Sequence, residues 1–597
     1  MPLFIKKGDF FTVSDRVPNH MFARFLASAR RFEEPWRNQN QLNFEYCDGE
    51  QWTEEEKSNI ESRGQQPTVI NTILPTVEMV CSVAHDRRAD FQVVGREGAD
   101  DEKATLMTAL LRHVFDTANF EYYHQTGFRS AVIGGRSWFE CNVFTDERGK
   151  DLIKVSLVPW ENVYLDPFSR LPDASDARFI IKTKWVDRDV AKMLFPKSEE
   201  LIDSAYSEEY KGQEWEAQMN SADRGDSFYY DVKSHRVRIC ECWYTMPEKK
   251  TVKILNERTG KEESKVINAN VVHFVIFSGD IILQGSATDH SQNVCPLGID
   301  MFPLVPLYCM RDRNGRPRGL VNSLIDIQDQ INKLNSKFLW TLMTNRLIAE
   351  EGALKDPDDA KLEMQKPDGL VIVNDGGLNR IRVDDKYRDL SYMSNHLQFL
   401  LSTEQRISGV NDSMLGLGGT NERSGIMQST RISQGAAMQT CILENMHFSK
   451  KRIALVVLRL IGKFYTDYRV VRITQPNGTT ENIEFNKPVP VMPGEGESAE
   501  FDRGLMKSTS AIFNKIEDTL YYDVTLKEVP PFDSMRERQL SIFAEVLKSN
   551  VIPAPIAAKM MLTLADMPGK ENIIFELDNF YQQQAAQAAA VPPPAGV

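Results

Sequence analysis

Residues 319–336 read GLVNSLIDIQDQINKLNS, and this stretch decides the fold. Its apolar residues recur every three or four positions, which is the spacing of one face of an α-helix. They are Leu320, Leu324, Ile327, Ile331, Leu334 and Phe338. We expect a helix over residues 319–349 that spans on the order of 40 Å at ~1.5 Å per residue.

The two faces of this helix leave its role open. Ile327, Ile331, Leu334 and Phe338 form a narrow apolar stripe that could pack against copies of the same helix. The competing interpretation is an ordinary amphipathic core helix with a solvated polar face, on which Lys333 and Lys337 would lie.

The sequence that follows predicts a small module between two helices. Residues 350–386 are acidic and strand-like, with Pro357, Pro367 and a turn at residues 374–377 (NDGG). Residues 387–410 return to helical spacing through Leu390, Leu397 and Leu400. One helix therefore leads out, a small domain follows, and a second helix leads back.

A glycine-rich stretch comes next. Residues 409–425 read GVNDSMLGLGGTNERSG, and such a composition favours a mobile loop, here placed at residues 411–423. Residues 424–467 then have helical spacing over roughly forty positions, far beyond the usual helix length, with a possible kink at Gly435.

The flanking regions mix helices and strands. Upstream, residues 21–64, 72–88 and 100–118 look helical, and strands follow, as where Ile153, Val155 and Leu157 alternate with polar residues. Downstream, residues 468–529 contain short strands, residues 530–581 look helical, and residues 582–597 are Gln/Ala-rich and flexible. The predicted fold class is α+β with several domains.

Composition narrows the functional classes. The chain has 597 residues and a formal net charge of -13, whereas a protein that holds nucleic acid tightly is normally basic. Its 8 cysteines are scattered and form no CxxC pair, which is typical of reduced cysteines in a cytoplasm. Residues 1–11 lack an apolar run of signal-peptide length, and no stretch is apolar enough to span a membrane.

Motifs for catalysis are missing. None of the Gly-Lys pairs is followed by Ser or Thr, as a phosphate-binding loop requires, and neither HExxH nor GxSxG occurs. The cluster of Asp356, Asp358 and Asp359 lacks histidine partners and is interpreted as a solvated acidic turn. We expect that the protein is not an enzyme and binds neither a metal nor a cofactor. The alternative is an enzyme, such as a nuclease or an ATPase.

Several local sequences, taken in order, carry a resemblance. They are residues 46–52 (YCDGEQW), residues 71–94 with their Arg-x-x-Phe exit, residues 158–179 with YLDP and DASDA, Phe195–Pro196, and residues 319–336. Together they resemble the portal proteins of tailed bacteriophages, in the podovirus-type branch, over residues 22–577.

The resemblance implies a multi-domain portal fold with named parts. These are an N-terminal arm and wing (residues 1–318), stem helices (319–349 and 387–410), a clip (350–386), a tunnel loop (411–423), a tunnel helix (424–467), returning wing strands (468–529), a crown (530–581) and a flexible tail (582–597). That tail is too short for the long helical barrel that some relatives carry.

The function it implies is a ring of about twelve subunits at one capsid vertex. Double-stranded DNA would pass through the ring during packaging, retention and ejection, in transient and non-specific contact. The implied protein partners are the terminase large subunit, a tail adaptor, the major capsid protein and a scaffolding protein. The protein would belong to the virion and be assembled in the host cytoplasm.

Candidate site residues follow from this assignment. The DNA-channel residues would be Asn411, Gly416, Gly418, Gly419, Asn421, Arg423, Lys333 and Lys337. Oligomer packing would use the stripe Ile327, Ile331, Leu334 and Phe338. Docking of the terminase and the adaptor would use Glu350, Glu351, Asp356, Asp358 and Asp359. The competing interpretation of residues 411–423 is a plain surface connector.

Overall fold

A computed structural model gives the fold for most of the chain. It describes residues 15–86, 89–95, 101–147, 149–206, 228–231, 233–255, 262–343, 347–364, 369–383, 387–411, 414, 434–435, 437–474, 480–490, 510–513, 516, 522–528 and 577. By its internal contacts the chain divides into one unit of Met1–Cys81 with Phe91–Thr525 and another of Ser82–Asp90 with Leu526–Val597. The site lies in the first unit.

The helices before the first long sheet agree with the predicted helical segments, except α5, which the sequence pattern did not predict. They are α1 (Met21–Asp48), α2 (Glu54–Glu61), α3 (Ile73–Asp86), α4 (Asp101–Thr117) and α5 (Phe120–Gly134). A capping box stabilises the start of α2, where the Thr53 hydroxyl accepts from Glu56 N–H and the Glu56 carboxylate accepts from Thr53 N–H. Gly49, with φ +94°, ends α1 in the left-handed conformation.

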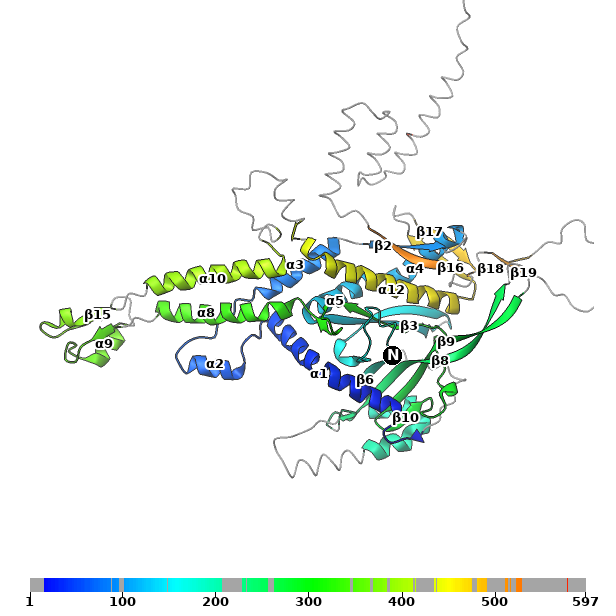
Figure 1. Ribbon diagram of the computed structural model, residues 1–597, viewed down its shortest axis with the longest axis horizontal. Helices are drawn as coiled ribbons and strands as arrows, with labels where there is room; N and C mark the ends of the chain where they lie inside the picture. Colours follow the sequence, from blue (N-terminus) through cyan, green and yellow to red (C-terminus); the bar gives the residue numbers. More distant parts are fainter. Residues whose placement is uncertain are drawn as a thin grey trace, which may run out of the picture. The chain divides into compact units, whose positions relative to one another are not determined.

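A seven-stranded antiparallel sheet forms the larger β layer (Figure 1). Its strand order is β1-β10-β9-β8-β6-β5, with β7 paired to β8. The strands are β1 (Asp15–Arg16), β5 (Val163–Leu165), β6 (Phe179–Asp187), β7 (Tyr230–Asp231), β8 (Arg236–Leu255), β9 (Glu262–Ser278) and β10 (Ile281–Gln284). Helix α1 buries Phe22, Leu26 and Ala29 against this sheet, in one core with Cys240 and Cys242.

A second, three-stranded sheet has the order β11-β3-β4, where the strands are β11 (Leu304–Tyr308), β3 (Arg136–Thr145) and β4 (Asp151–Val158). Helices α5 and α12 (Thr440–Phe464) pack on it. Gly127 of α5 permits this approach, because a Cβ there would lie 2.4 Å from the Phe139 ring. Helix α6 (Arg188–Leu194) and a hairpin of β12 (Met310–Arg311) and β13 (Pro317–Arg318) complete the region.

The helices around the module match the prediction with one correction. The outgoing helix α8 covers Ile325–Met343 and the returning helix α10 covers Tyr387–Ser408. The prediction that the outgoing helix continues to residue 349 was wrong, because Leu347–Ala349 forms strand β14 and pairs with β15 (Ile381–Val383). Short strands follow α12, as expected, and the helices predicted over residues 530–581 lie almost entirely outside the described residues. The strands after α12 are β16 (Arg469–Thr474), β17 (Thr480–Phe485), β18 (Lys487–Pro490), β19 (Ser510–Phe513) and β20 (Tyr522–Glu528), whereas β2 (Ala89–Gly95) lies between α3 and α4.

Candidate functional site

The apolar stripe of α8 is buried against α10 of the same chain (Figure 1). Ile327 and Ile331 form an apolar cluster with Leu400 of α10, and Ile331 is 0% exposed. Leu334 is partly buried against this cluster, whereas Phe338 is only half-buried. Three of the four residues predicted for packing between subunits therefore hold together the two helices of one subunit.

A row of amide and hydroxyl side chains covers another face of α8. Ser336 Oγ accepts from Thr68 N–H at 3.1 Å, Asn332 Oδ1 from Ile70 N–H at 3.0 Å, and Gln328 Oε1 from Thr72 N–H at 3.2 Å. Gln328 Nε2 also donates to Ile70 O at 2.6 Å.

The row works because two repeats coincide. Two residues of extended chain rise by about 6.6 Å, and four residues of helix rise by about 6.0 Å. The residues at positions 68, 70 and 72 therefore meet every fourth residue of α8 in register. These positions lie on a face that the sequence interpretation did not single out, although the four-residue spacing of the amides is visible in the sequence. The polar face that was expected to be solvated, which carries Lys333 and Lys337, is exposed.

The two lysines predicted to contact DNA differ in their surroundings. Lys333 Nζ lies 3.0 Å from a Glu56 carboxylate oxygen and 3.5 Å from Asp329, so its charge is largely balanced within the chain. Hydrogen bonding to Glu56 is the main reason that the pKa of Lys333 is raised. Lys337 is exposed.

Residues 347–383 form a small module of their own. Strands β14 and β15 pair in antiparallel register, with Ile348 opposite Arg382. Asn374 Nδ2 donates to the carbonyls of Gly352 and Leu354, which closes the loop between them. The predicted acidic turn is instead the start of helix α9 (Pro357–Glu363), because the Asp356 carboxylate accepts from the N–H groups of Asp358 and Asp359.

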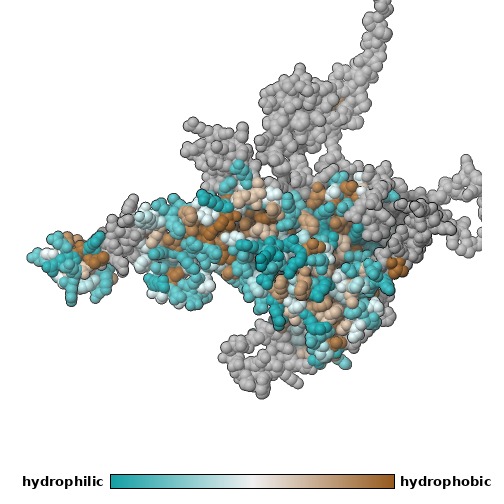
Figure 2. Space-filling view, in the orientation of Figure 1, coloured by the Kyte–Doolittle hydropathy of each residue, from teal (hydrophilic) through white to brown (hydrophobic). Residues whose placement is uncertain are grey.

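The surface of this module combines hydrophilic and hydrophobic residues (Figure 2). All five predicted docking residues, Glu350, Glu351, Asp356, Asp358 and Asp359, are exposed. Large apolar side chains are exposed beside them, with Leu378 at 79% and Leu370 at 74%, and Ile348, Leu362 and Ile372 each more than half exposed. Sequence reasoning used the charges and missed the apolar residues.

The predicted tunnel loop falls mostly outside the described residues. Gly416, Gly418, Gly419, Asn421 and Arg423 all lie there, as does the predicted start of the long helix near residue 424. Asn411 follows α10 and its carbonyl accepts from Met414 N–H at 2.9 Å. Gly435, on the far side of the undescribed residues, lies close to Met414 and Gly409. A Cβ at Gly435 would lie 2.5 Å from Met414 Sδ and 2.8 Å from Gly409 O. The two ends of the loop are thus packed together.

Helix α12 is anchored to the three-stranded sheet by polar contacts as well as apolar ones. Ser449 Oγ donates to Pro306 O at 3.1 Å, and Asn445 Nδ2 donates to Cys309 O at 2.9 Å. Lys450, 3% exposed, pairs with Glu121 of α5 at 2.9 Å. The helix that follows the loop is therefore a rigid element.

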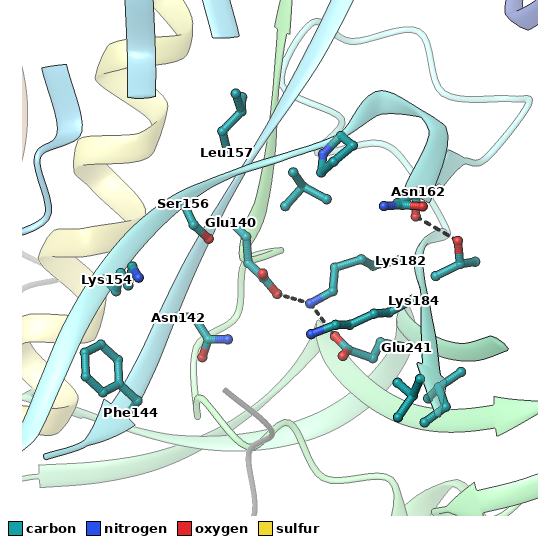
Figure 3. Close-up of a pocket in the computed structure, with 15 residues that line it drawn as sticks. Glu140, Asn142, Phe144, Lys154, Ser156, Leu157, Asn162, Lys182, Lys184 and Glu241 are labelled. Atoms are coloured by element: carbon teal, nitrogen blue, oxygen red, sulfur yellow. Dashed lines mark hydrogen bonds and ion pairs between the residues drawn. The ribbon is translucent and has the colours of Figure 1, made fainter. Parts of the chain in front are cut away.

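A cavity of about 320 Å³ lies between the two sheets, and Figure 3 shows its lining. The Lys182 ammonium lies 2.6 Å from Glu140 and 2.7 Å from Glu241. Burial opposes the charge on Lys182, but the two carboxylates outweigh burial and raise its pKa. Burial in turn raises the pKa of Glu241. A buried ion triad of this kind joins the sheets and offers no nucleophile.

Two further features bear on chemistry. Within the described residues, no group of three or more His, Cys, Asp or Glu side chains could hold a metal ion. None of the described helices is long and apolar enough to cross a bilayer.

Comparison with known proteins shows the family to which the chain belongs. The sequence profile of the phage P22-like portal proteins matches residues 23–595, nearly the whole chain. The portal protein of Helicobacter pylori bacteriophage KHP30 is 20% identical over 434 residues, which cover 72% of this chain and 64% of that protein. The alignment thus spans less than two thirds of that relative's length. Since the family profile covers far more than half of the chain, the chain belongs to the phage P22-like portal protein family.

Proposed function

We propose that this chain is the subunit of a ring-shaped channel at one capsid vertex, through which double-stranded DNA is packaged, retained and ejected. The observation that carries the proposal is the packed pair of α8 and α10 with a separate module inserted between them, in a chain of the portal family. A ring of about twelve subunits is part of the proposal. Its role is structural, and a separate packaging ATPase supplies the energy.

The charge of the chain suits a channel through which DNA slides. Each phosphate that a protein neutralises adds a salt-dependent hold on DNA. The net charge of -13, and the pairing of Lys333 with Glu56 and Asp329, keep such holds few. Transient contacts come from Lys337 and from the loop of residues 411–423. The loop residues concerned are Asn411, Gly416, Gly418, Gly419, Asn421 and Arg423.

The module of residues 347–383 is the docking platform in this proposal. Its exposed apolar residues Leu370 and Leu378 supply contact area, and the exposed acids around α9 supply charge complementary to a basic partner. Terminase binds it during packaging and the tail adaptor binds it afterwards. The capsid and scaffolding proteins are further partners, in the virion and during assembly in the host cytoplasm.

Ring formation depends on the α8–α10 pair in this proposal. The stripe Ile327, Ile331 and Leu334 holds the pair together inside one subunit, and the half-buried Phe338 lies farther along the same helix. The pair then acts as one rigid unit that meets its neighbours through its remaining surface. Loss of the stripe therefore weakens the ring through the fold of each subunit.

The test is purification of the full chain with imaging, native mass spectrometry and an ATP-hydrolysis assay. We expect annular particles with the mass of a closed ring and no ATP hydrolysis. Empty capsids that contain the ring should become filled with DNA when a terminase, double-stranded DNA and ATP are added. A monomeric species with metal-dependent nuclease or ATPase turnover would contradict the proposal in favour of an enzyme of the same virus.

A further inference from the structure

The hairpin β12–β13 is strongly basic in an otherwise acidic chain. Residues 310–319 read MRDRNGRPRG, with four arginines and no lysine. They are Arg311, Arg313, Arg316 and Arg318. A fifth arginine, Arg170, lies beside them, since its guanidinium donates to Asn314 O and its own carbonyl accepts from Arg311 Nη1 at 2.6 Å.

None of these five arginines pairs with a carboxylate among the described residues. Arg318 Nη2 donates to Ser323 Oγ at 3.2 Å, and Arg316 stacks 4.9 Å from the Phe32 ring. The Nε atom of Arg316 is buried without a hydrogen-bond partner in the described structure. Arg313 is fully on the surface.

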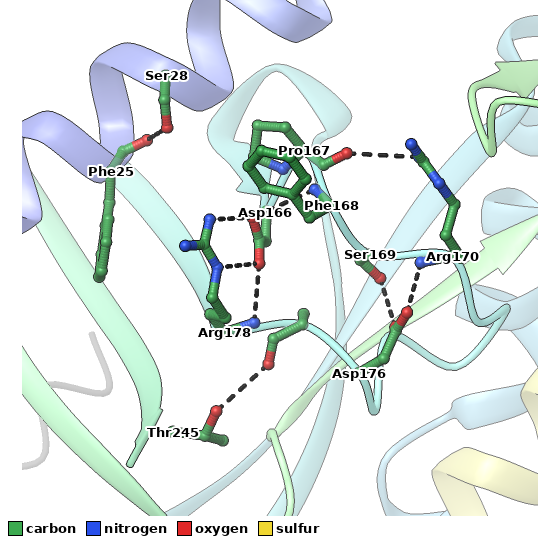
Figure 4. Close-up of polar contacts among 11 residues, drawn as sticks. Phe25, Ser28, Asp166, Pro167, Phe168, Ser169, Arg170, Asp176, Arg178 and Thr245 are labelled. Atoms are coloured by element: carbon green, nitrogen blue, oxygen red, sulfur yellow. Dashed lines mark hydrogen bonds and ion pairs between the residues drawn. The ribbon is translucent and has the colours of Figure 1, made fainter.

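Two acids close to the arginines bind main-chain N–H groups. Asp312 Oδ1 accepts from the N–H groups of Asn314 and Arg316, both at 2.8 Å. Asp176 accepts from Arg170 N–H at 2.5 Å and from Leu171 N–H at 3.1 Å, as Figure 4 shows for Arg170. Both carboxylates therefore hold main-chain turns, and neither forms an ion pair with these guanidinium groups.

The hairpin is held rigidly in place. Cys309 N–H donates to Gly135 O at 3.0 Å, and Leu320 N–H donates to Val132 O at 2.8 Å. Gly135 has φ +99°, and a Cβ there would lie 2.6 Å from Arg318 N, so only glycine allows this approach. The arginines are thus presented by a fixed backbone, which lowers the entropy lost when they bind a ligand.

A cleft of about 310 Å³ adjoins the arginines. Its lining combines Arg316 and Arg318 with Asp312 and with Gln39, Asn43 and Asn322. The side-chain N–H groups of Gln39 and Asn43 donate to Asn43 Oδ1 and to Ile133 O. The two guanidinium forks are therefore the donors of this lining that match the oxygens of phosphates.

We propose that this arginine hairpin is a second DNA contact, which holds the phosphates of duplex DNA outside the channel loop. The choice of DNA as the polyanion rests on the proposed function. A row of arginines on a hairpin presents several fixed charges at once, as the repeated phosphates of a duplex do. An acidic surface on a neighbouring copy is the competing occupant.

The test uses covalently closed circular DNA, which cannot thread through a ring that is already closed. Binding of relaxed circles to purified rings is measured between 50 mM and 200 mM salt. The test variant is Arg313→Gln with Arg318→Gln. The control is Arg63→Gln with Lys197→Gln, which removes the same charge from two exposed side chains elsewhere.

We expect the slope of log affinity against log salt to fall by about two for each subunit that the duplex touches. The variant ring should therefore lose less affinity between 50 mM and 200 mM salt than the unmodified ring does. The difference is about tenfold for each subunit that the duplex touches. The control should keep the original slope. If the double variant does not fold, Arg313→Gln alone should lower the slope by about one.

Three outcomes would overturn the inference. Equal loss in the test and control variants would mean that net charge alone attracts DNA. Absence of circle binding by the unmodified ring would leave the hairpin without a DNA contact. A folded test variant that no longer forms rings would assign the arginines to a neighbouring subunit. Rings that bind circles but package no linear DNA would instead contradict the proposed function.

Discussion

Helix α8 and the module of residues 347–383 use similar residues in opposite ways. Ile331 of α8 is completely buried, whereas Leu378 of the module is 79% exposed. The amides of α8 are hydrogen-bonded to a neighbouring segment, whereas the acids of the module face solvent. Groups that are satisfied within one chain stabilise the fold. Groups that are left unsatisfied on a folded surface are available to a partner.

The ion pairs of α8 and of the module also differ. On α8, Lys333 contacts two carboxylates at 3.0 and 3.5 Å, whereas in the module Arg380 lies 3.9 Å from Glu350 with both side chains well exposed. Exposed pairs of the second kind contribute little to stability. The comparison predicts that substitutions in α8 act on stability and substitutions in the module act on binding.

The largest expected effect is that of Ile331→Ala at the centre of the α8–α10 cluster. The cavity it leaves should lower the free energy of unfolding by about 2–5 kcal/mol. Urea unfolding of the full chain measures it. Leu342→Ala, on the same helix but 51% exposed, is the matched control and should change stability by less than about 0.5 kcal/mol. Equal effects of the two would show that α8 is not packed as described.

Asn332→Ala should come next. It leaves the Ile70 N–H and the Gln51 amide oxygen without the partners that Asn332 supplies, which costs about 1–3 kcal/mol. Thermal melting measures the loss, and Lys337→Ala on the exposed face is the control. If Asn332→Ala melts like the unmodified chain, the amide row does not hold the segment of residues 68–72 on α8.

A smaller effect depends on pH. Glu404 of α10 is 6% exposed, and burial raises its pKa, although a hydrogen bond from Thr76 at 3.0 Å counteracts this in part. Between the unfolded pKa of about 4.3 and the higher folded value, the folded state binds more protons. Stability should therefore fall as pH rises through this window, by at most about 1.4 kcal/mol per pH unit from this group.

Glu404→Gln cannot ionise and should lack this loss. The measurement is the difference in melting temperature between the variant and the unmodified chain from pH 4 to pH 7. The difference should grow in favour of the variant as pH rises. A constant difference would mean that Glu404 titrates alike in the folded and unfolded chains.

The smallest effect on stability is expected in the module. Leu370→Ser with Leu378→Ser should each change the free energy of unfolding by less than about 0.5 kcal/mol, because both side chains are already in water. Rings with this double substitution should nevertheless fail to retain terminase or adaptor in a pull-down. Retention at the normal level would remove the apolar surface from the docking proposal, and Leu171→Ser, 48% exposed elsewhere, controls for general surface effects.

Apolar spacing predicted several of the described helices. The helices α1, α3, α4, α8 and α10 lie where the pattern placed them, since a helix buries one face at a fixed period. The end of α8 was missed because Leu347–Ala349 continues the apolar spacing but finds its partners in β15. Pairing over more than thirty residues of sequence leaves no local signal.

The site shows the same limit. The sequence alone predicted the outgoing helix, the small module and the returning helix, because length and periodicity are local properties of the chain. The sequence also showed which side chains are acidic or basic. Only the tertiary structure decided that the stripe of α8 faces α10, that Lys333 is balanced by Glu56, and that the arginines of β12–β13 form no ion pair among the described residues. The physical reason is that burial and charge pairing depend on neighbours distant in sequence, and folding alone brings those neighbours together.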